Sequence, residues 1–269
     1  SGGNPLFAIE IALAGPAAGA APASLAQLVR DRLDRLSPEA ADVARWAAIA
    51  GPDVSVAALE GAVALDVAAL AVALEELERH ALLRECPAAP GRLEFAQAVV
   101  RKVVVEGLSA PRRRLMHRRL AEVLGALDGC EGELARHAAL AGDMAIAARA
   151  CVAAARRCLR VFAGTEALVF ARRGLRYADR VEEPERVRLM LDLADAYLLA
   201  RRPDDIDAAI ARIQPLAERA LDFGCMEHAA LGFRMLSWLR WEGGDWADAH
   251  RDMLQVEAAG RAADPGGRA

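Results

Sequence analysis

Apolar residues recur along most of this chain at spacings of three and four, the period of an amphipathic helix. Leu70, Leu74 and Leu77, for example, share one face of a segment whose first turn Asp66 can cap. Ser37 begins a Ser-Pro-Glu triplet that combines a hydroxyl cap, a proline at a tolerant position and an acid near the positive end of the helix dipole. The chain is therefore expected to be all-α, apart from one short interruption.

The interruption consists of two short runs that read as strands. Residues 82–86 and 92–95 mix apolar and charged residues, and Pro87 to Gly91 between them reads as a turn. Helices are expected on either side of this hairpin, over 38–50, 56–63, 66–80 and 96–107. The pattern predicts a winged-helix module over residues 37–110, with a small two-stranded wing.

After Pro111 the pattern predicts paired helices only. The expected pairs are 112–127 with 133–140, 144–161 with 164–180, 184–201 with 204–222, and 225–242 with 245–260. Their spacing gives a period near 41, longer than the roughly 34 residues of tetratricopeptide repeats. Residues 111–260 are therefore expected to form an α-solenoid of tetratricopeptide-like hairpins, and 261–269 a disordered tail.

The charge balance argues against nucleic-acid binding by this chain. The net charge of the 269 residues is −4 and the isoelectric point is about 5.8, so no global field attracts phosphates. The basic stretch 112–119 has no interleaved aromatic residue on which a base could stack, and it is interpreted as a solvated face or a contact with an acidic neighbouring domain. Lys102 is the only lysine, and it lies in an apolar run without the glycine-rich turn of a phosphate-binding loop. We therefore expect no ATP hydrolysis by this chain alone.

Other chemistry is also not indicated. The five cysteines have no Cys-x-x-Cys spacing, and Cys151 and Cys158 are interpreted as small core residues. The histidines stand singly, so neither a metal site nor a catalytic site is expected, and the chain is not predicted to be an enzyme. No apolar run is long enough for a membrane span and no basic leader precedes the first apolar stretch. These features predict a cytoplasmic protein.

The first residues carry a resemblance. The segment 3–7 (Gly-Asn-Pro-Leu-Phe) resembles the Gly-x-Pro motif that follows the nucleotide core of STAND-type regulatory ATPases. In that family the proline packs on the adenine ring. The resemblance implies that Asn4 and Pro5 lie near the nucleotide of the intact protein, and that residues 1–36 end a helical module beside it.

A second segment is similar to the same family. Residues 95–101 resemble its Phe-x-His-x-Leu-x-Arg pattern, with Gln97 at the histidine position and Arg101 at the arginine. The family's histidine contacts the diphosphate, whereas glutamine can donate a hydrogen bond but cannot carry a charge. By resemblance, Gln97 and Arg101 are nucleotide-proximal. The chain itself is expected to hold no cofactor, and ATP or ADP is expected in the full-length protein.

The resemblance implies a function for the whole segment. It is similar to the middle of bacterial transcriptional regulators of the large ATP-binding LuxR type, which have an upstream ATPase and a downstream DNA-binding domain. In such a protein it would sense a protein or small-molecule effector on its helical repeats and relay the signal to the nucleotide switch. Two alternatives stay open: a protein–protein interaction scaffold without nucleotide coupling, and the same region of a cyclase- or kinase-linked regulator.

One cluster stands out as a candidate binding surface. Trp238, Trp241 and Trp246 fall within nine positions, and Arg234 lies one turn before the first of them. Rigid aromatic side chains of this kind can stack on a sugar or an apolar ligand. Packing between adjacent hairpins, or a face covered by a further repeat, is the alternative interpretation.

Overall fold

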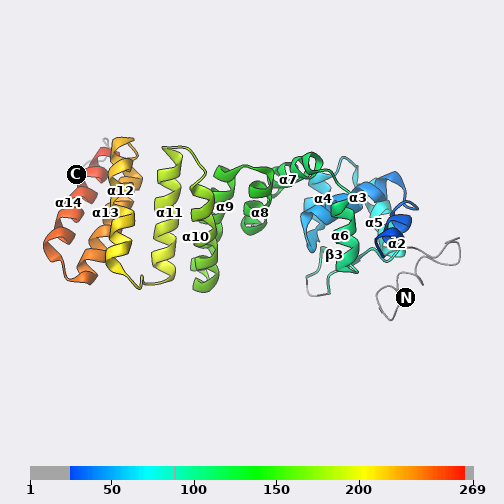
Figure 1. Ribbon diagram of the computed structural model, residues 1–269, viewed down its shortest axis with the longest axis horizontal. Coiled ribbons are helices and arrows are strands. Elements are labelled where there is room, and N and C mark those ends of the chain that lie inside the picture. The colour runs from blue at the N-terminus through cyan, green and yellow to red at the C-terminus, as the bar shows by residue number, and fades with distance from the viewer. Residues whose placement is uncertain (1–24, 88, 264–269) are drawn as a thin grey trace. The chain divides into compact units, whose positions relative to one another are not determined.

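The computed structural model describes residues 25–87 and 89–263, and this part of the chain is mostly helical (Figure 1). The prediction of a mainly helical chain is confirmed. The chain divides into two compact units, Ser1–Leu127 and Asp128–Ala269. Asn4, Pro5 and residues 264–269 of the expected tail lie outside the described residues.

The first unit contains the helices and strands that were expected over residues 37–110, together with further elements. In chain order they are α2 (Leu25–Leu33), α3 (Pro38–Ala50), β1 (Asp53–Ser55), α4 (Val56–Ala62), α5 (Val67–Arg79), β2 (Leu83–Glu85), β3 (Arg92–Phe95), α6 (Ala98–Glu106) and α7 (Ala110–Leu124). Ser37 caps α3, since its hydroxyl accepts a hydrogen bond from the Ala40 N–H at 3.1 Å. The Ser37 hydroxyl and backbone N–H in turn donate to the Glu76 carboxylate at 2.6 and 2.8 Å. These two bonds lower the pKa of Glu76 and tie the start of α3 to α5.

The sheet has three strands where the sequence predicted two. It is antiparallel in the order β1-β3-β2, so β3 is central. Val54 lies opposite Leu93, and Leu83 lies opposite Phe95; all four side chains are buried. The sequence did not reveal β1 because three residues are too few for an alternating pattern. Ser55 also ends the strand by capping α4, since it accepts a hydrogen bond from the Ala58 N–H at 3.1 Å.

Helix α7 packs within the first unit. It was predicted to pair with the helix near 133–140, but it packs against α3 and α4 inside the first unit. Arg112 forms an ion pair with Asp42 at 3.1 Å, and Arg119 donates to the Gly61 carbonyl at 2.8 Å. The basic face of this helix is therefore partly used to attach it to its neighbours.

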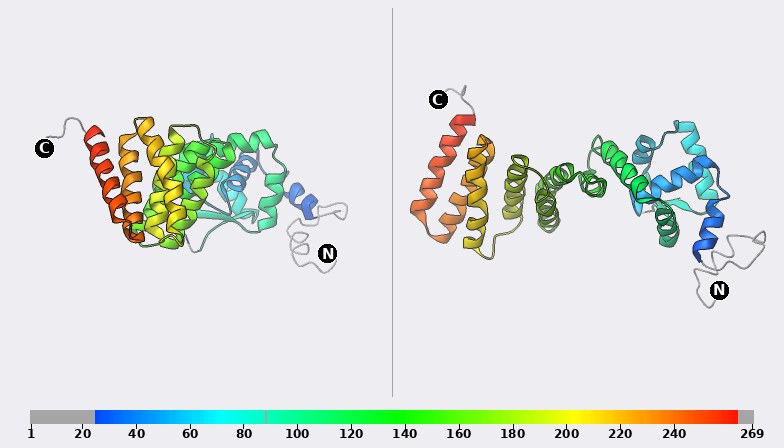
Figure 2. Two further views of the ribbon diagram at one scale, coloured as in Figure 1. Left: turned by 60° about the vertical axis from the view of Figure 1, so that its left-hand side comes forward. Right: turned by 45° about the horizontal axis from the view of Figure 1, so that its top comes forward.

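The second unit is an array of helices. They are α8 (Glu131–Ala141), α9 (Met144–Arg160), α10 (Gly164–Ala178), α11 (Glu185–Ala200), α12 (Ile206–Asp222), α13 (Met226–Gly243) and α14 (Trp246–Ala263). Consecutive helices pack together in chain order, as Figures 1 and 2 show. The starts of α9, α11 and α13 at 144, 185 and 226 are separated by 41 residues each time (185 − 144 and 226 − 185), the period expected from the sequence. Residues 261–263, expected in the tail, belong to α14.

Neighbouring helices of the array are joined by close packing and by ion pairs. A Cβ atom at Gly232 of α13 would lie 2.6 Å from the Ala217 Cβ of α12, so only glycine allows this approach. On the first helices, Arg149 pairs with Glu185, and Arg156 pairs with Asp192 at 2.6 Å. Both bridges join α9 to α11 across 36 residues of sequence. They match particular turns of α9 with particular turns of α11.

Candidate ligand-binding site in the last hairpin

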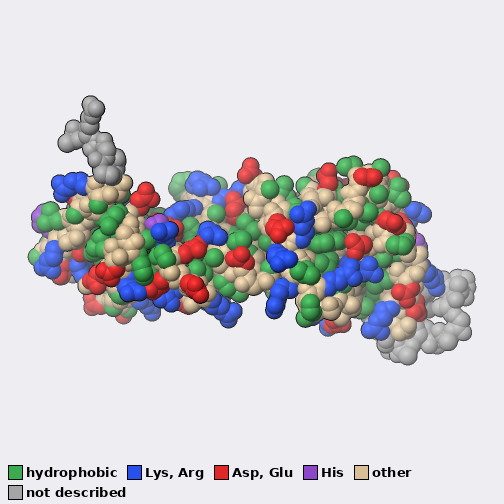
Figure 3. Space-filling view, turned by 90° about the horizontal axis from the view of Figure 1, so that it is seen from above, with side chains coloured by type: hydrophobic (Ala, Val, Ile, Leu, Met, Phe, Trp, Pro, Cys, Tyr) green, Lys and Arg blue, Asp and Glu red, His purple; other side chains and the backbone are tan. Residues whose placement is uncertain are grey.

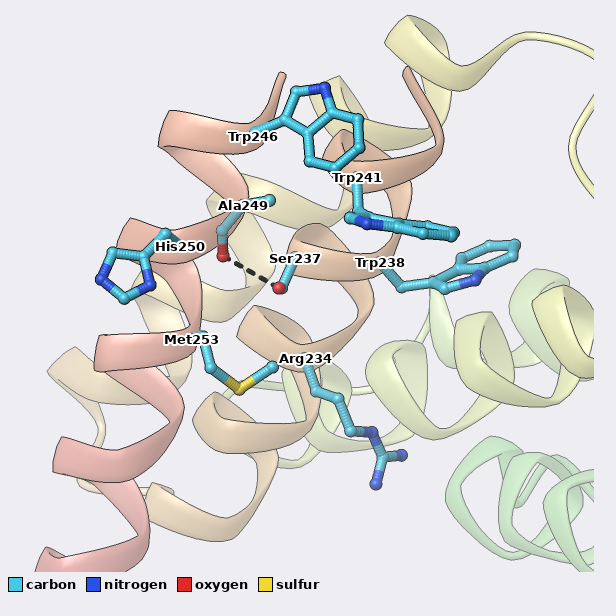
Figure 4. A pocket seen from close by; sticks show the side chains of 8 residues that line it. All are labelled: Arg234, Ser237, Trp238, Trp241, Trp246, Ala249, His250 and Met253. Atoms are coloured by element: carbon cyan, nitrogen blue, oxygen red, sulfur yellow. Dashed lines mark hydrogen bonds between the residues drawn. The ribbon is translucent and has the colours of Figure 1, made fainter. Parts of the chain in front are cut away.

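The candidate site is built on one face of α13 and the start of α14. Arg234, Trp238 and Trp241 are spaced four and three apart, so they follow one face of α13. Gly244, at φ +86°, ends that helix in the left-handed conformation that glycine favours. The turn sends the chain back so that Trp246, the first residue of α14, stands beside Trp241 (Figure 4).

These side chains line a single cavity of about 430 Å³, within the usual size range of small-molecule sites. Its lining comes only from α13 and α14: Arg234, Ser237, Trp238, Trp241, Trp246, Ala249, His250 and Met253. The structure thus brings together all four residues of the candidate surface that the sequence indicated.

The aromatic residues are exposed rather than buried between hairpins. The exposed fractions are 38% for Trp238, 54% for Trp241 and 66% for Trp246. The ring centroids of Trp241 and Trp246 are 6.3 Å apart, and their planes meet at 66°, an edge-to-face arrangement that is favourable for aromatic pairs. Below them the Ser237 hydroxyl donates to the Ala249 carbonyl at 2.9 Å, which joins the two helices under the cavity (Figure 4).

Arg234 lies at the opposite end of the cavity from Trp246 (Figure 4). Its Nη2 donates to Oδ1 of Asp195 on α11 at 3.3 Å, while the Arg234 side chain stays 60% exposed. Because guanidinium has five N–H donors, this single bond leaves most of them for another partner. Asp195 therefore orients the Arg234 guanidinium and leaves its other N–H donors available to a ligand.

Arg234 also lines a second cavity, of about 490 Å³. The first helices of three successive hairpins and α14 contribute to it: Arg156, Asp192, Glu227, His228, Ala230, Leu231, Arg234 and Val256. Asp192 is shared here, since it accepts from Arg156 at 2.6 Å and lies 3.6 Å from His228. This cavity has both charged and apolar lining residues, whereas the tryptophan cavity is largely apolar.

The residues predicted to be nucleotide-proximal lie in the first unit. Gln97 directly precedes α6 without capping it, and its Oε1 is buried but accepts no hydrogen bond from the part of the chain that the structure describes. Arg101 of α6 donates through Nε to the Ala48 carbonyl of α3 at 3.1 Å. Arg101 therefore has a role inside this unit, while Gln97 keeps an unused acceptor.

Other chemistry is sparse in residues 25–87 and 89–263. No three His, Cys, Asp or Glu side chains gather there as a metal site would require. Burial raises the pKa of the Cys151 thiol to about 11, which keeps it protonated and unreactive. None of the described helices has the length and apolar character to span a membrane.

Comparison with known proteins adds no relative. The chain matches no protein-family model, and no curated protein or solved structure is significantly similar to it. The function therefore has to be argued from the geometry of the sites.

Sequence reasoning missed half of the tryptophan cavity and nearly all of the second one. Ala249, His250 and Met253 follow Trp246 at spacings of three, four and seven, so the signal was present as one face of α14. It was not used because small and mixed residues on a helix face do not show what that face borders. The second cavity joins residues of four helices, and no single stretch of sequence carries that information.

Proposed function

We propose that the chain is the signal-sensing and relay part of a STAND-type regulatory ATPase of the large ATP-binding LuxR type. The helical hairpins would bind a small-molecule or protein effector. The first unit would pass that event to a nucleotide switch, and DNA binding would belong to a separate output domain. The observation that carries the sensing role is the cavity formed by three exposed tryptophans and Arg234 in the last hairpin.

The first unit supports the relay part of the proposal. Its order of helix, strand, two helices and a β-hairpin, from α3 to β3, suits a winged-helix module, and the 41-residue hairpins suit tetratricopeptide-like repeats. Gln97 directly precedes α6, where the resemblance implies a nucleotide contact, and its amide N–H groups can donate to a phosphate. The space-filling view shows basic and acidic side chains interspersed on the visible face, so this face offers no uniformly basic surface to nucleic acid (Figure 3).

A protein-interaction scaffold without nucleotide coupling is the second candidate. It is favoured by the uncharged Gln97 and by the engagement of Arg101 with the Ala48 carbonyl, since neither residue then needs a phosphate. The same exposed tryptophans would serve as anchors for a partner. A cyclase- or kinase-linked regulator would share all the features of the first proposal.

The test begins with the site itself. A mixed set of aromatic acids, aromatic amines, oligosaccharides and peptides is screened by thermal shift against the chain and against Trp241→Ala. Because Trp241 is exposed, this change should alter the free energy of unfolding by less than about 1 kcal/mol while removing the response to any true ligand. A loss of about 3 kcal/mol or more would show that Trp241 is core packing, and the sensing role would fail.

The relay is tested by hydrogen exchange on the chain with the best compound bound. Sensing with relay predicts protection in α13 and α14 and, in addition, a changed exchange rate in residues 95–108 of the first unit. Changes confined to the second unit would favour the scaffold. The Trp46→Phe variant, altered in the first unit, should respond like the unaltered chain.

A further inference from the structure

We infer that the tryptophan cavity binds a small aromatic molecule that carries one negative charge, such as an aromatic carboxylate. The inference rests on the proposed sensing function and goes further by assigning the chemical class of the ligand. It follows from the kinds of side chain that line the cavity, from those absent among them, and from the position of Arg234.

The lining selects an aromatic body. Trp238, Trp241, Trp246 and Met253 form most of the wall, and all four are more than a third exposed. Indole faces and edges interact with a second ring beyond simple burial, and a thioether adds contacts at ring edges. The volume of about 430 Å³ accommodates a one- or two-ring compound.

The lining argues against a sugar. A saccharide brings many hydroxyl groups, and each one that leaves water without a new partner lowers affinity. The polar groups of the wall are the Ser237 hydroxyl, whose proton is already donated to the Ala249 carbonyl, the side chains of Arg234 and His250, and the indole N–H groups. Most of the remaining wall is apolar. Stacking on tryptophan alone would not replace the lost hydrogen bonds.

The charges argue for an anion. No carboxylate is among the eight lining residues, whereas the guanidinium of Arg234 is. A cationic ligand would therefore meet the positive charge of Arg234, which Asp195 only partly offsets, although tryptophan faces by themselves attract cations. Arg234 presents unused N–H donors at the end of the cavity away from Trp246 (Figure 4), where they can bind a carboxylate through two parallel hydrogen bonds.

Asp195 has a defined part in this arrangement. It holds the Arg234 guanidinium through one hydrogen bond at 3.3 Å, and it lies on α11 rather than in the cavity wall. Its negative charge partly offsets that of the arginine. Asp195 therefore weakens the attraction between Arg234 and an anionic ligand. It acts as a positioning residue, because it holds the guanidinium without touching the ligand.

The experiment titrates the 269-residue chain calorimetrically with three compounds of one ring system. These are 2-naphthoate, the neutral 2-naphthalenemethanol and the cationic 2-naphthylmethylammonium; a neutral trisaccharide is the fourth probe. We expect 2-naphthoate to bind about tenfold more tightly than the alcohol, and the ammonium compound to bind least among the three. Raising the salt concentration should reduce the advantage of the anion.

The variants locate the binding. Arg234→Gln should weaken 2-naphthoate about tenfold and leave the alcohol unchanged, whereas Asp195→Asn should strengthen 2-naphthoate about threefold. Trp241→Ala should weaken both aromatic compounds. Arg212→Gln, an exposed arginine on α12 outside both cavities, is the matched control and should change nothing.

Several outcomes overturn the inference. Tighter binding of the ammonium compound or of the trisaccharide, with dependence on Trp241, would disprove the ligand class and leave the sensing function standing. An aromatic peptide that binds more than tenfold tighter than 2-naphthoate would replace the small molecule with a protein partner. If none of the probes binds at millimolar concentration through Trp241, both the inference and the small-molecule sensing role fail.

Discussion

The hairpin α9–α10 and the hairpin α13–α14 have the same helical framework but opposite compositions. Buried positions of α9 and α10 are almost all Ala, with Cys151, Val152 and Gly174 among them. The last hairpin buries larger residues, including Phe233, Leu236 and Leu239, and it also buries the polar Ser237 and Asp252. The comparison teaches that one hairpin is built for close helix contact, and the other for larger side chains beside a cavity.

The largest effect is expected at the buried ion pair of the last hairpin. Arg240 and Asp252 are 2.6 Å apart with side chains only 13% and 6% exposed, and Arg240 also donates to the Gln214 Oε1 at 2.8 Å. Arg240→Met leaves the Asp252 charge buried without its partner and should lower the free energy of unfolding by about 3 kcal/mol. Urea denaturation followed by circular dichroism gives the value.

Two controls sharpen this prediction. Arg149→Met removes the exposed pair with Glu185 from the other hairpin and should cost less than about 1 kcal/mol. The double variant Arg240→Met/Asp252→Leu should regain most of the loss, because no charge remains buried. Equal losses from Arg240→Met and Arg149→Met would contradict the distinction between the two hairpins.

The next effect is expected in the small-residue hairpin. A Cβ at Gly174 would lie 2.4 Å from Cδ2 of Leu193 and 2.9 Å from Cβ of Cys151. Gly174→Ala should therefore destabilise the chain by about 2 kcal/mol through overpacking. Gly260 of α14 has no atom within 4 Å of its Cβ position, so Gly260→Ala should stabilise by about 0.5–1 kcal/mol. Thermal unfolding of both variants checks the signs, and a stabilising Gly174→Ala would refute close contact at that position.

A smaller effect separates the turns of the two hairpins. The turn after α13 uses Gly244 at φ +86°, whereas the turn after α9 places Phe162 at φ +59° with its side chain 97% exposed. A left-handed conformation costs a non-glycine residue roughly 1–2 kcal/mol. Glycine avoids this strain, but it loses more conformational entropy on folding, which cancels part of the gain. Phe162→Gly should thus stabilise the chain by about 0.5–1 kcal/mol, and Gly244→Ala should destabilise it by about 1 kcal/mol. If chemical denaturation shows that Phe162→Gly is destabilising, the Phe162 side chain makes stabilising contacts, and the strain argument is wrong.

The smallest effect is a pH dependence confined to the last hairpin. Burial raises the pKa of Asp252 above its ordinary value, and Arg240 only partly offsets this. The folded state then holds the proton more strongly than the unfolded state. The stability that this proton contributes is present below the unfolded pKa and is lost as pH rises through the folded pKa.

The effect is measured as the pH-dependent part of the difference in unfolding free energy between the chain and Asp252→Asn, and it should be the smallest of the set. Denaturation series from pH 3.5 to 7 would show the difference changing in the acid range and flat near neutrality. A difference that grows in favour of the unaltered chain as pH rises would mean that the ion pair outweighs burial.

The sequence predicted the individual helices and strands far better than the packing between distant segments. The caps at Ser37 and Asp66, the strands near 83–95 and the hairpin period follow from signals within a few residues, and the structure places those elements within a few positions. Strand β1 and the packing of α7 were missed because both depend on which distant surface a short or mixed segment meets. The tryptophans could be placed on the two sides of a turn, but the face of α14 that borders the same cavity could not be predicted.

The two bridges between α9 and α11 have a mechanical consequence. Arg149 and Arg156 are seven residues apart, as are their partners Glu185 and Asp192, so both pairs meet only in one register. Sliding one helix past the other by one turn would move the partners by about 5.4 Å and break both bridges together. Tilting one helix about either bridge keeps that bridge intact. The array should thus resist shear between these helices more than bending, so strain applied to it would be taken up as curvature.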